Sequence, residues 1–103
     1  MKSILTNLAK QQIRQTAKYI RREFGIKTSQ EFIQKVYQTR CLIEEHPNIG
    51  SVEPLLAERT VMHRSCVVNR LNKMVYRIKD DNIIEIVAFW DVRRDPGMLA
   101  NQV

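Results

Sequence analysis

The chain reads Ile83-Ile84-Glu85-Ile86-Val87-Ala88-Phe89-Trp90 in the stretch that decides its fold, and Asp91-Val92-Arg93-Arg94-Asp95-Pro96 follows directly. The first of these segments is almost wholly apolar, which is typical of a strand buried in a sheet. No glycine separates this strand from two adjacent arginines and a proline. We expect the proline to end the regular structure. We therefore expect the strand to deliver Arg93 and Arg94 from a rigid core to a fixed place on the surface.

Two further β-like runs precede this strand, at residues 61–68 and 73–79. In the second run, apolar side chains alternate with mostly charged ones, which predicts a sheet with one covered face and one more open face. The short segment 69–72 and the segment Asp80-Asp81-Asn82 are suited to tight hairpin turns. The three runs therefore predict an antiparallel meander.

The first half of the chain carries two helical patterns. An apolar stripe of period 3.6 runs along the first pattern, and Gly25 follows it where a left-handed cap is expected. The second helix should begin at Thr28 and end near Glu45, with a connection of three or four residues between the helices. Residues 1–6 are expected to form a short edge strand. This order predicts a single α+β domain over residues 1–103, in which an antiparallel helical hairpin packs on one face of the sheet.

The charge of the chain is strongly positive, at +6 with an isoelectric point of about 9.7. Six basic residues and no acidic residue occur between Arg59 and Lys79, which favours a polyanion or an acidic protein as partner. No stretch approaches the ~20 apolar residues of a membrane span, so we expect a cytoplasmic protein without a membrane partner. Cys41 and Cys66 lack metal-ligand spacing, and we expect no metal and no cofactor.

Cations on the predicted strands are the best candidates for a functional site, because guanidinium groups bind phosphate with paired hydrogen bonds. They are Arg64, Lys73, Arg77 and Arg93. The alternative is that some of them pair with Glu85 or Asp91 or are simply solvated. His63 adjoins Arg64 and is either a functional or a structural residue. Trp90 either fills the core at the end of the strand or anchors a partner.

Three features occur together in a fixed order: the strand core Val75-Tyr76-Arg77-Ile78, the turn Asp80-Asp81-Asn82, and the ending Trp90-Asp91-Val92-Arg93-Arg94-Asp95-Pro96. In this order and spacing, and over nearly the whole chain, they resemble the RelE/ParE superfamily of bacterial toxins. The resemblance implies a small basic toxin of a type II toxin–antitoxin pair, associated with growth inhibition and plasmid stabilisation. It also implies a small acidic antitoxin, whose extended segment wraps the toxin.

The resemblance implies one of two targets, since RelE-like members cut messenger RNA on the ribosome and ParE-like members poison DNA gyrase. On the RelE pattern, Arg64, Lys73 and Arg93 fall at or near basic positions of the RNase site and would be catalytic. Cys66 falls where a lysine is usual, and Leu99 falls near the expected catalytic tyrosine. RNA cleavage needs a group that removes a proton and a group that supplies one. The chain thus has cations that could stabilise negative charge in an RNase site, but no clear residue that would remove or supply the protons.

Three functions stay open at this point. The first is a toxin that binds DNA gyrase, which we favour because binding needs no acid or base. The second is a ribosome-dependent endoribonuclease, and the third is a non-toxic nucleic-acid-binding module. The residues expected to bind the target or nucleic acid are Arg59, His63, Arg70, Arg77, Trp90 and Arg94.

Overall fold

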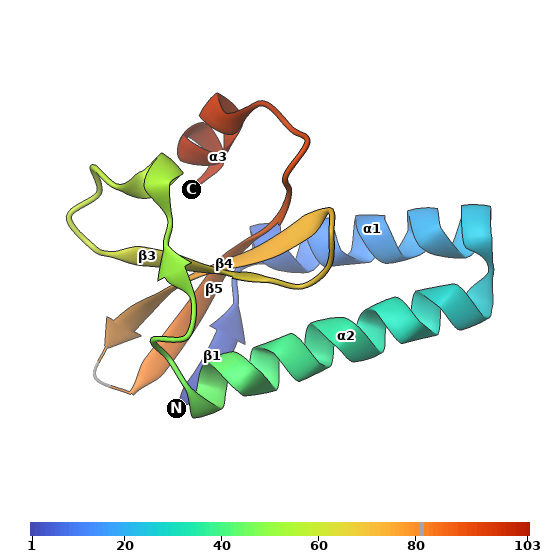
Figure 1. The fold of residues 1–103 in the computed structure, drawn as a ribbon, viewed down its shortest axis with the longest axis horizontal. Helices are drawn as coiled ribbons and strands as arrows, with labels where there is room; N and C mark the ends of the chain where they lie inside the picture. Colours follow the sequence, from blue (N-terminus) through green and yellow to red (C-terminus); the bar gives the residue numbers. More distant parts are fainter. Residues whose placement is uncertain (81) are drawn as a thin grey trace.

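The computed structural model describes residues 1–80 and 82–103, and Figure 1 shows the path of the chain. Its elements are β1 (Lys2–Leu5), α1 (Asn7–Phe24), α2 (Ile26–Glu45), β2 (Ser51–Val52), the 3₁₀ turn η1 (Pro54–Leu56), β3 (His63–Val67), β4 (Asn72–Asp80), β5 (Ile83–Asp91) and α3 (Pro96–Gln102). One sheet contains the strands in the order β1-β5-β4-β3-β2. Strands β3, β4 and β5 form the expected antiparallel meander, and β1 lies parallel to β5 at the edge. The predicted α+β class is confirmed, whereas Asp81 of the predicted turn lies outside the described residues.

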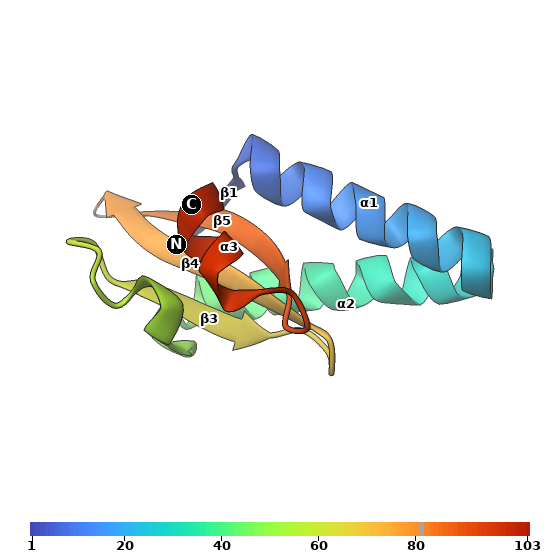
Figure 2. The same cartoon turned by 90° about the horizontal axis from the view of Figure 1, so that it is seen from above.

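Helices α1 and α2 form the expected hairpin, which projects past the end of the sheet (Figure 2). The connection is a single residue, Gly25, with φ of +96°. Its N–H donates to the Arg21 carbonyl oxygen at 3.0 Å, and its own carbonyl oxygen accepts from the Ser29 N–H at 3.2 Å. The prediction of a longer connection and of a start at Thr28 was wrong. A left-handed glycine both ends the first helix and caps the second, so α2 begins at Ile26.

A β-bulge in β5 divides its side chains between the two faces of the sheet. Tyr76 pairs with Ile86, but the preceding Val75 pairs with Ala88, so Val87 is an extra residue on β5. The core beneath α1 and α2 receives from β5 the side chains of Ile84, Ile86 and Phe89. A second core on the opposite face receives Val87, Ala88 and Trp90. Without the extra residue, strict alternation would turn Trp90 towards the helices.

The opposite face, expected to be more open, is partly covered by η1 and α3. Pro96 was expected to end the regular structure but is the first residue of α3, where its missing N–H needs no partner. The Asp95 side chain caps this helix by accepting from the Gly97 N–H at 3.0 Å. Leu99 of α3 is fully buried in the second core beside Leu56 of η1. Of the described helices, none has the length and apolar content required to cross a membrane.

Candidate functional site

The candidate cations on the strands lie on two different faces of the sheet. Arg64 pairs with Tyr76, whose side chain lies in the core beneath α1 and α2. Lys73 pairs with Trp90, whose side chain lies in the second core. Because directly paired residues project to the same face, Arg64 and Lys73 point to opposite faces. The structure therefore does not bring Arg64, Lys73 and Arg93 together on one surface.

Arg64 holds the loop that follows α2. Its Nη1 donates to the Gly50 carbonyl oxygen at 2.8 Å. The Gly50 N–H donates to the Tyr76 hydroxyl at 3.0 Å, and that hydroxyl donates to the Pro47 carbonyl oxygen at 2.7 Å. Burial raises the pKa of Tyr76, so the hydroxyl stays protonated as this network requires. Arg64 thus stabilises the loop after α2, on the face of the sheet that the helices cover.

Lys73 pairs with Glu53, whose side chain is fully buried. The same carboxylate accepts hydrogen bonds from the Ser65 hydroxyl at 2.8 Å and from the Leu55 N–H at 3.1 Å. Burial alone would raise the pKa of the Glu53 carboxyl, but the hydrogen bonds from Lys73, Leu55 and Ser65 outweigh it and hold the pKa below its ordinary value. The carboxylate is therefore charged, and the Lys73 ammonium neutralises it.

His63 and Arg77 lie opposite each other on the same face as Lys73. His63 is buried, and its Nδ1 lies 3.0 Å from the Val61 carbonyl oxygen. Burial lowers the pKa of the His63 imidazole, and the neighbouring positive charge of Arg77 adds to this effect. The Arg77 Nε donates to Glu85 Oε1 at 3.0 Å. The imidazole is thus held neutral beside an ion pair.

Two of the arginines expected to bind a target, Arg94 and Arg59, instead make contacts within the chain, near or on α3. The Arg94 guanidinium lies 4.7 Å from the centre of the Trp90 ring, and Trp90 is 1% exposed. The Arg59 Nη2 donates to the Ala100 carbonyl oxygen at 2.6 Å. Of the two roles considered for Trp90, its burial supports the core role, with the ring covered by a cation of the same chain.

Arg93 and Arg70 are brought together at a groove of about 730 Å³ between α1 and the β3–β4 turn. Four apolar side chains line it: Ile20 is partly buried, and the other three, Tyr19, Phe24 and Leu71, are substantially exposed. Sequence reasoning assigned none of the three to a site. The sequence does contain one indication of this site: Tyr19 lies outside the apolar stripe of α1, so its aromatic side chain is not needed for the core.

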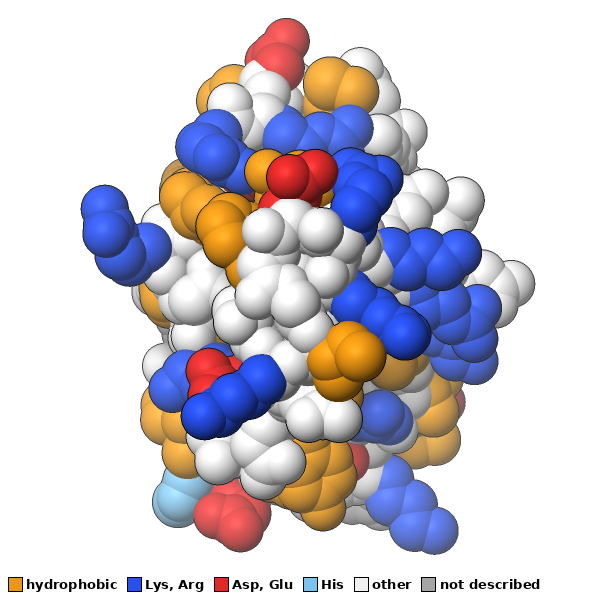
Figure 3. Space-filling model, turned by 90° about the vertical axis from the view of Figure 1, so that its right-hand side faces the viewer, with side chains coloured by type: hydrophobic (Ala, Val, Ile, Leu, Met, Phe, Trp, Pro, Cys, Tyr) orange, Lys and Arg blue, Asp and Glu red, His pale blue; other side chains and the backbone are white. Residues whose placement is uncertain are grey.

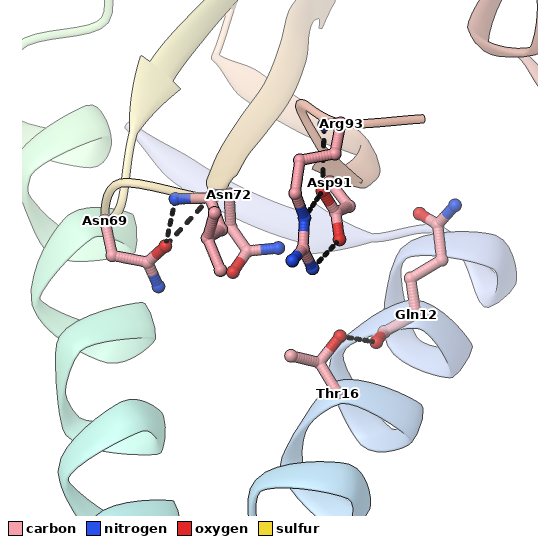
Figure 4. A network of polar contacts seen from close by, with 7 residues as sticks. Gln12, Thr16, Asn69, Asn72, Asp91 and Arg93 are labelled. Atoms are coloured by element: carbon pink, nitrogen blue, oxygen red, sulfur yellow. Dashed lines mark hydrogen bonds and ion pairs between the residues drawn. The ribbon is translucent and has the colours of Figure 1, made fainter. Parts of the chain in front are cut away.

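The polar rim of the groove is fixed by short hydrogen bonds (Figure 4). Arg93 binds the Asp91 carboxylate in two places, with Nε 3.0 Å from Oδ1 and Nη2 2.7 Å from Oδ2. This pairing lowers the pKa of Asp91 and raises that of Arg93. On the neighbouring β3–β4 turn, the Asn69 side-chain oxygen accepts from the N–H groups of Leu71 and Asn72 at 2.8 and 3.0 Å. These hydrogen bonds therefore preorganise the rim for binding.

The chemistry of this groove suits the binding of a protein partner. Its described lining consists of apolar, amide, hydroxyl and guanidinium groups with the Asp91 carboxylate, and contains no histidine, cysteine or lysine. Aromatic and arginine side chains are the residue types enriched at protein interfaces. The groove is the candidate functional site.

A family model described as the ParE toxin of type II toxin-antitoxin systems, parDE, matches residues 4–96. The chain therefore belongs to the ParE toxin family. The resemblance to the RelE/ParE superfamily is confirmed, and membership of this family implies an antitoxin partner.

Solved structures show the same fold. The chain is similar to "Chromosomal ParDE TA system from P. aeruginosa", with a TM-score of 0.72, 17% identity, and coverage of 89% of this chain and 96% of that one. It is similar to the YoeB/ParE toxin from Agrobacterium tumefaciens, with a TM-score of 0.58, 16% identity, and coverage of 88% and 98%. For the YoeB dimer from Staphylococcus aureus the values are 0.57, 21%, 86% and 93%. A comparison with curated proteins gave no match.

Proposed function

We propose that this toxin inhibits growth by binding DNA gyrase through the groove, and that a small acidic antitoxin neutralises it. The observation that carries the proposal is the separation of the candidate RNase cations. Arg64 is bound to Gly50 on one face of the sheet, while Lys73 is bound to Glu53 on the other. Membership of a toxin family argues against the third function, a non-toxic nucleic-acid-binding module.

The positions of His63 and Leu99 support binding over RNA cleavage. Cleavage by the 2′-hydroxyl needs a group that removes one proton and a group that supplies another. His63 is buried on the face opposite to Arg64, with its Nδ1 beside the Val61 carbonyl oxygen. Leu99, near the position where the RelE pattern has a tyrosine, lies inside the second core. A toxin that acts by binding needs neither group.

The groove offers the features of a protein-binding surface. Tyr19 and Phe24 of α1 present aromatic side chains that are 51% and 64% exposed, and burial of such rings is a main source of binding free energy. Arg70 adds positive charge at the rim, whereas the charge of Arg93 is balanced by the Asp91 carboxylate. The net charge of +6 also favours a fast encounter with an acidic antitoxin.

Two assays on the purified toxin test this function. The first follows plasmid supercoiling by gyrase and the accumulation of gyrase–DNA breaks. The second maps messenger RNA in a translating bacterial extract. We expect inhibited supercoiling with breaks, and intact messenger RNA. Cleavage at defined codon positions together with normal supercoiling would instead establish the ribosome-dependent endoribonuclease.

A matched pair of charge reversals localises the activity. Arg93→Glu changes a cation at the rim of the groove, whereas Lys2→Glu changes an exposed cation on β1. We expect the first to weaken inhibition of gyrase and the second to leave it unchanged. Equal inhibition by both variants would show that the groove is not the binding surface, even if gyrase is the target.

A further inference from the structure

A column of cations runs along the exposed side of α1, away from the groove. It comprises Lys10, Arg14, Lys18 and Arg21, at spacings of four, four and three residues. At 1.5 Å per residue, the column extends over roughly 16 Å of the helix. All four side chains are exposed, and within the described residues no ion pair joins any of them to a carboxylate. We call these four residues the basic column.

An exposed apolar row lies on α2. Ile26, Ile33 and Tyr37 follow one another at intervals of seven and four residues, so they share one side of the helix. Their exposed fractions are 56%, 45% and 63%. Gln30 and Gln34 lie beside these residues on the solvent side of the helix, and Lys27 lies next to Gln34. We call the three apolar residues the apolar row.

The basic column and the apolar row lie side by side on the outer face of the hairpin. The Ser29 hydroxyl of α2 donates to the Ala17 carbonyl oxygen of α1 at 3.0 Å, which marks the line where the helices touch. Arg21, of the basic column, lies one helical turn from Ala17 and on nearly the same side of α1. Ile33, of the apolar row, lies one helical turn from Ser29 and on nearly the same side of α2. Both rows therefore border this line on the exposed side. Figure 3, which looks at the tip of the hairpin, shows Lys and Arg side chains gathered on one side with hydrophobic side chains beside them.

We propose that this outer face binds an amphipathic helix of a partner protein, with Asp or Glu along one side and aliphatic residues along the adjacent side. Acidic residues would meet the basic column, and aliphatic residues would cover the apolar row. A shallow channel between two packed helices accepts the ridge of side chains of a third helix. The site lies outside the groove, and the proposal holds whichever target the toxin has.

Charge and polarity favour this occupant over two others. A second copy docked through the same face would place its own cations against the basic column, since α1 carries five basic residues and a single acidic one, Glu23. A nucleic acid would neutralise the basic column but would leave Ile33 and Tyr37 in water. Only a partner that is both acidic and apolar satisfies the two rows together.

The test is the binding of a labelled helical peptide of about 18 residues, which is about five turns. Glutamate and leucine occupy adjacent sides of this peptide. The controls are a permuted peptide of the same composition without helical periodicity, and a short DNA duplex. Binding is followed by fluorescence anisotropy, and amide chemical shifts of the labelled toxin locate the peptide. We expect the periodic peptide to bind best and to shift amides of the outer face.

Two double variants and one matched control complete the design. Arg14→Glu with Lys18→Glu reverses part of the basic column, and Ile33→Ala with Tyr37→Ala removes most of the apolar row. Each pair should weaken binding of the periodic peptide by about tenfold or more. Lys2→Glu with Lys79→Glu, which changes exposed cations elsewhere, should leave it unchanged. All these side chains are exposed, so circular dichroism should report an unaltered fold.

Several results would overturn the proposal. Absence of binding by the periodic peptide, or equal binding by the permuted peptide, would remove its basis. Tighter binding of the DNA duplex, weakened by reversal of the basic column and unaffected by loss of the apolar row, would identify a nucleic-acid surface instead. Shifts confined to the groove would place the peptide at the other site.

Discussion

The Lys73 ammonium contacts the Glu53 carboxylate beneath η1, and this carboxylate is fully buried. Loss of one partner of a buried ion pair leaves the other charge without compensation, at a cost of about 3–5 kcal/mol. We therefore expect Lys73→Ala to lower the free energy of unfolding by about 3 kcal/mol in urea titrations. Lys79→Ala, which removes a half-exposed lysine 3.8 Å from Glu85, should cost less than about 1 kcal/mol. Equal effects of the two variants would show that the buried pair contributes no more to the free energy of unfolding than the exposed pair.

The buried imidazole of His63 predicts a loss of stability on mild acidification. Its pKa in the folded state is lowered below the ordinary 6.5, so the unfolded chain binds this proton more readily. The contribution of His63 to stability is then fully present above pH 6.5 and decreases as the pH falls through the interval below it. Unfolding measured across this range should show a decline that His63→Gln flattens. His46→Gln, at an exposed position, should leave the decline unchanged.

Gly50 is predicted to tolerate no side chain. A Cβ at this position would lie 2.7 Å from the Ser65 carbonyl oxygen and 2.8 Å from the Tyr76 hydroxyl, and the first of these atoms is backbone. Gly50→Ala should therefore lower the free energy of unfolding by about 1–3 kcal/mol, as overpacking does. Gly97→Ala is the matched control, because its Cβ would meet only the Asp95 side chain at 3.5 Å. A thermal melt in which both variants match the wild type would contradict this geometry.

Local patterns predicted the architecture but not the details that depend on distant contacts. Apolar periodicity was sufficient for the hairpin and the meander, because each helix and strand buries its own stripe or face. The bulge at Val87 was not visible, since it appears only when β5 is paired with β4. Pro96 was misinterpreted because proline suits the first turn of a helix as well as the end of regular structure.

The candidate site was less accessible from the sequence for the same reason. Glu53 lies between the predicted second helix and the first predicted strand, where no regular structure was predicted, so nothing indicated that it would be buried and paired with Lys73. Arg93 and Arg70 were selected for their charge, and the structure places both at the groove. Tyr19 and Leu71 come from distant parts of the chain, and only the packing of α1 on the sheet, chiefly on β5, places them at one groove.

The aromatic side chains of the groove should carry more binding free energy than its charges. Truncation of an aromatic anchor at an interface typically costs about 2 kcal/mol or more, whereas an exposed ion pair contributes about 1 kcal/mol or less. Tyr19→Ala with Phe24→Ala is therefore expected to weaken binding of gyrase by tenfold or more, and Arg70→Ala by only a few-fold. Titration of the inhibition by each variant measures both effects. A larger loss from Arg70→Ala would point to a mainly electrostatic interface.

The most direct measurement of the proposed action is plasmid supercoiling by purified gyrase in the presence of the wild-type toxin and the Tyr19→Ala, Phe24→Ala variant. We predict that the wild type stops supercoiling and accumulates broken DNA, and that the variant, although folded, requires a much higher concentration for the same effect. Normal supercoiling in the presence of excess wild-type toxin would contradict the proposal.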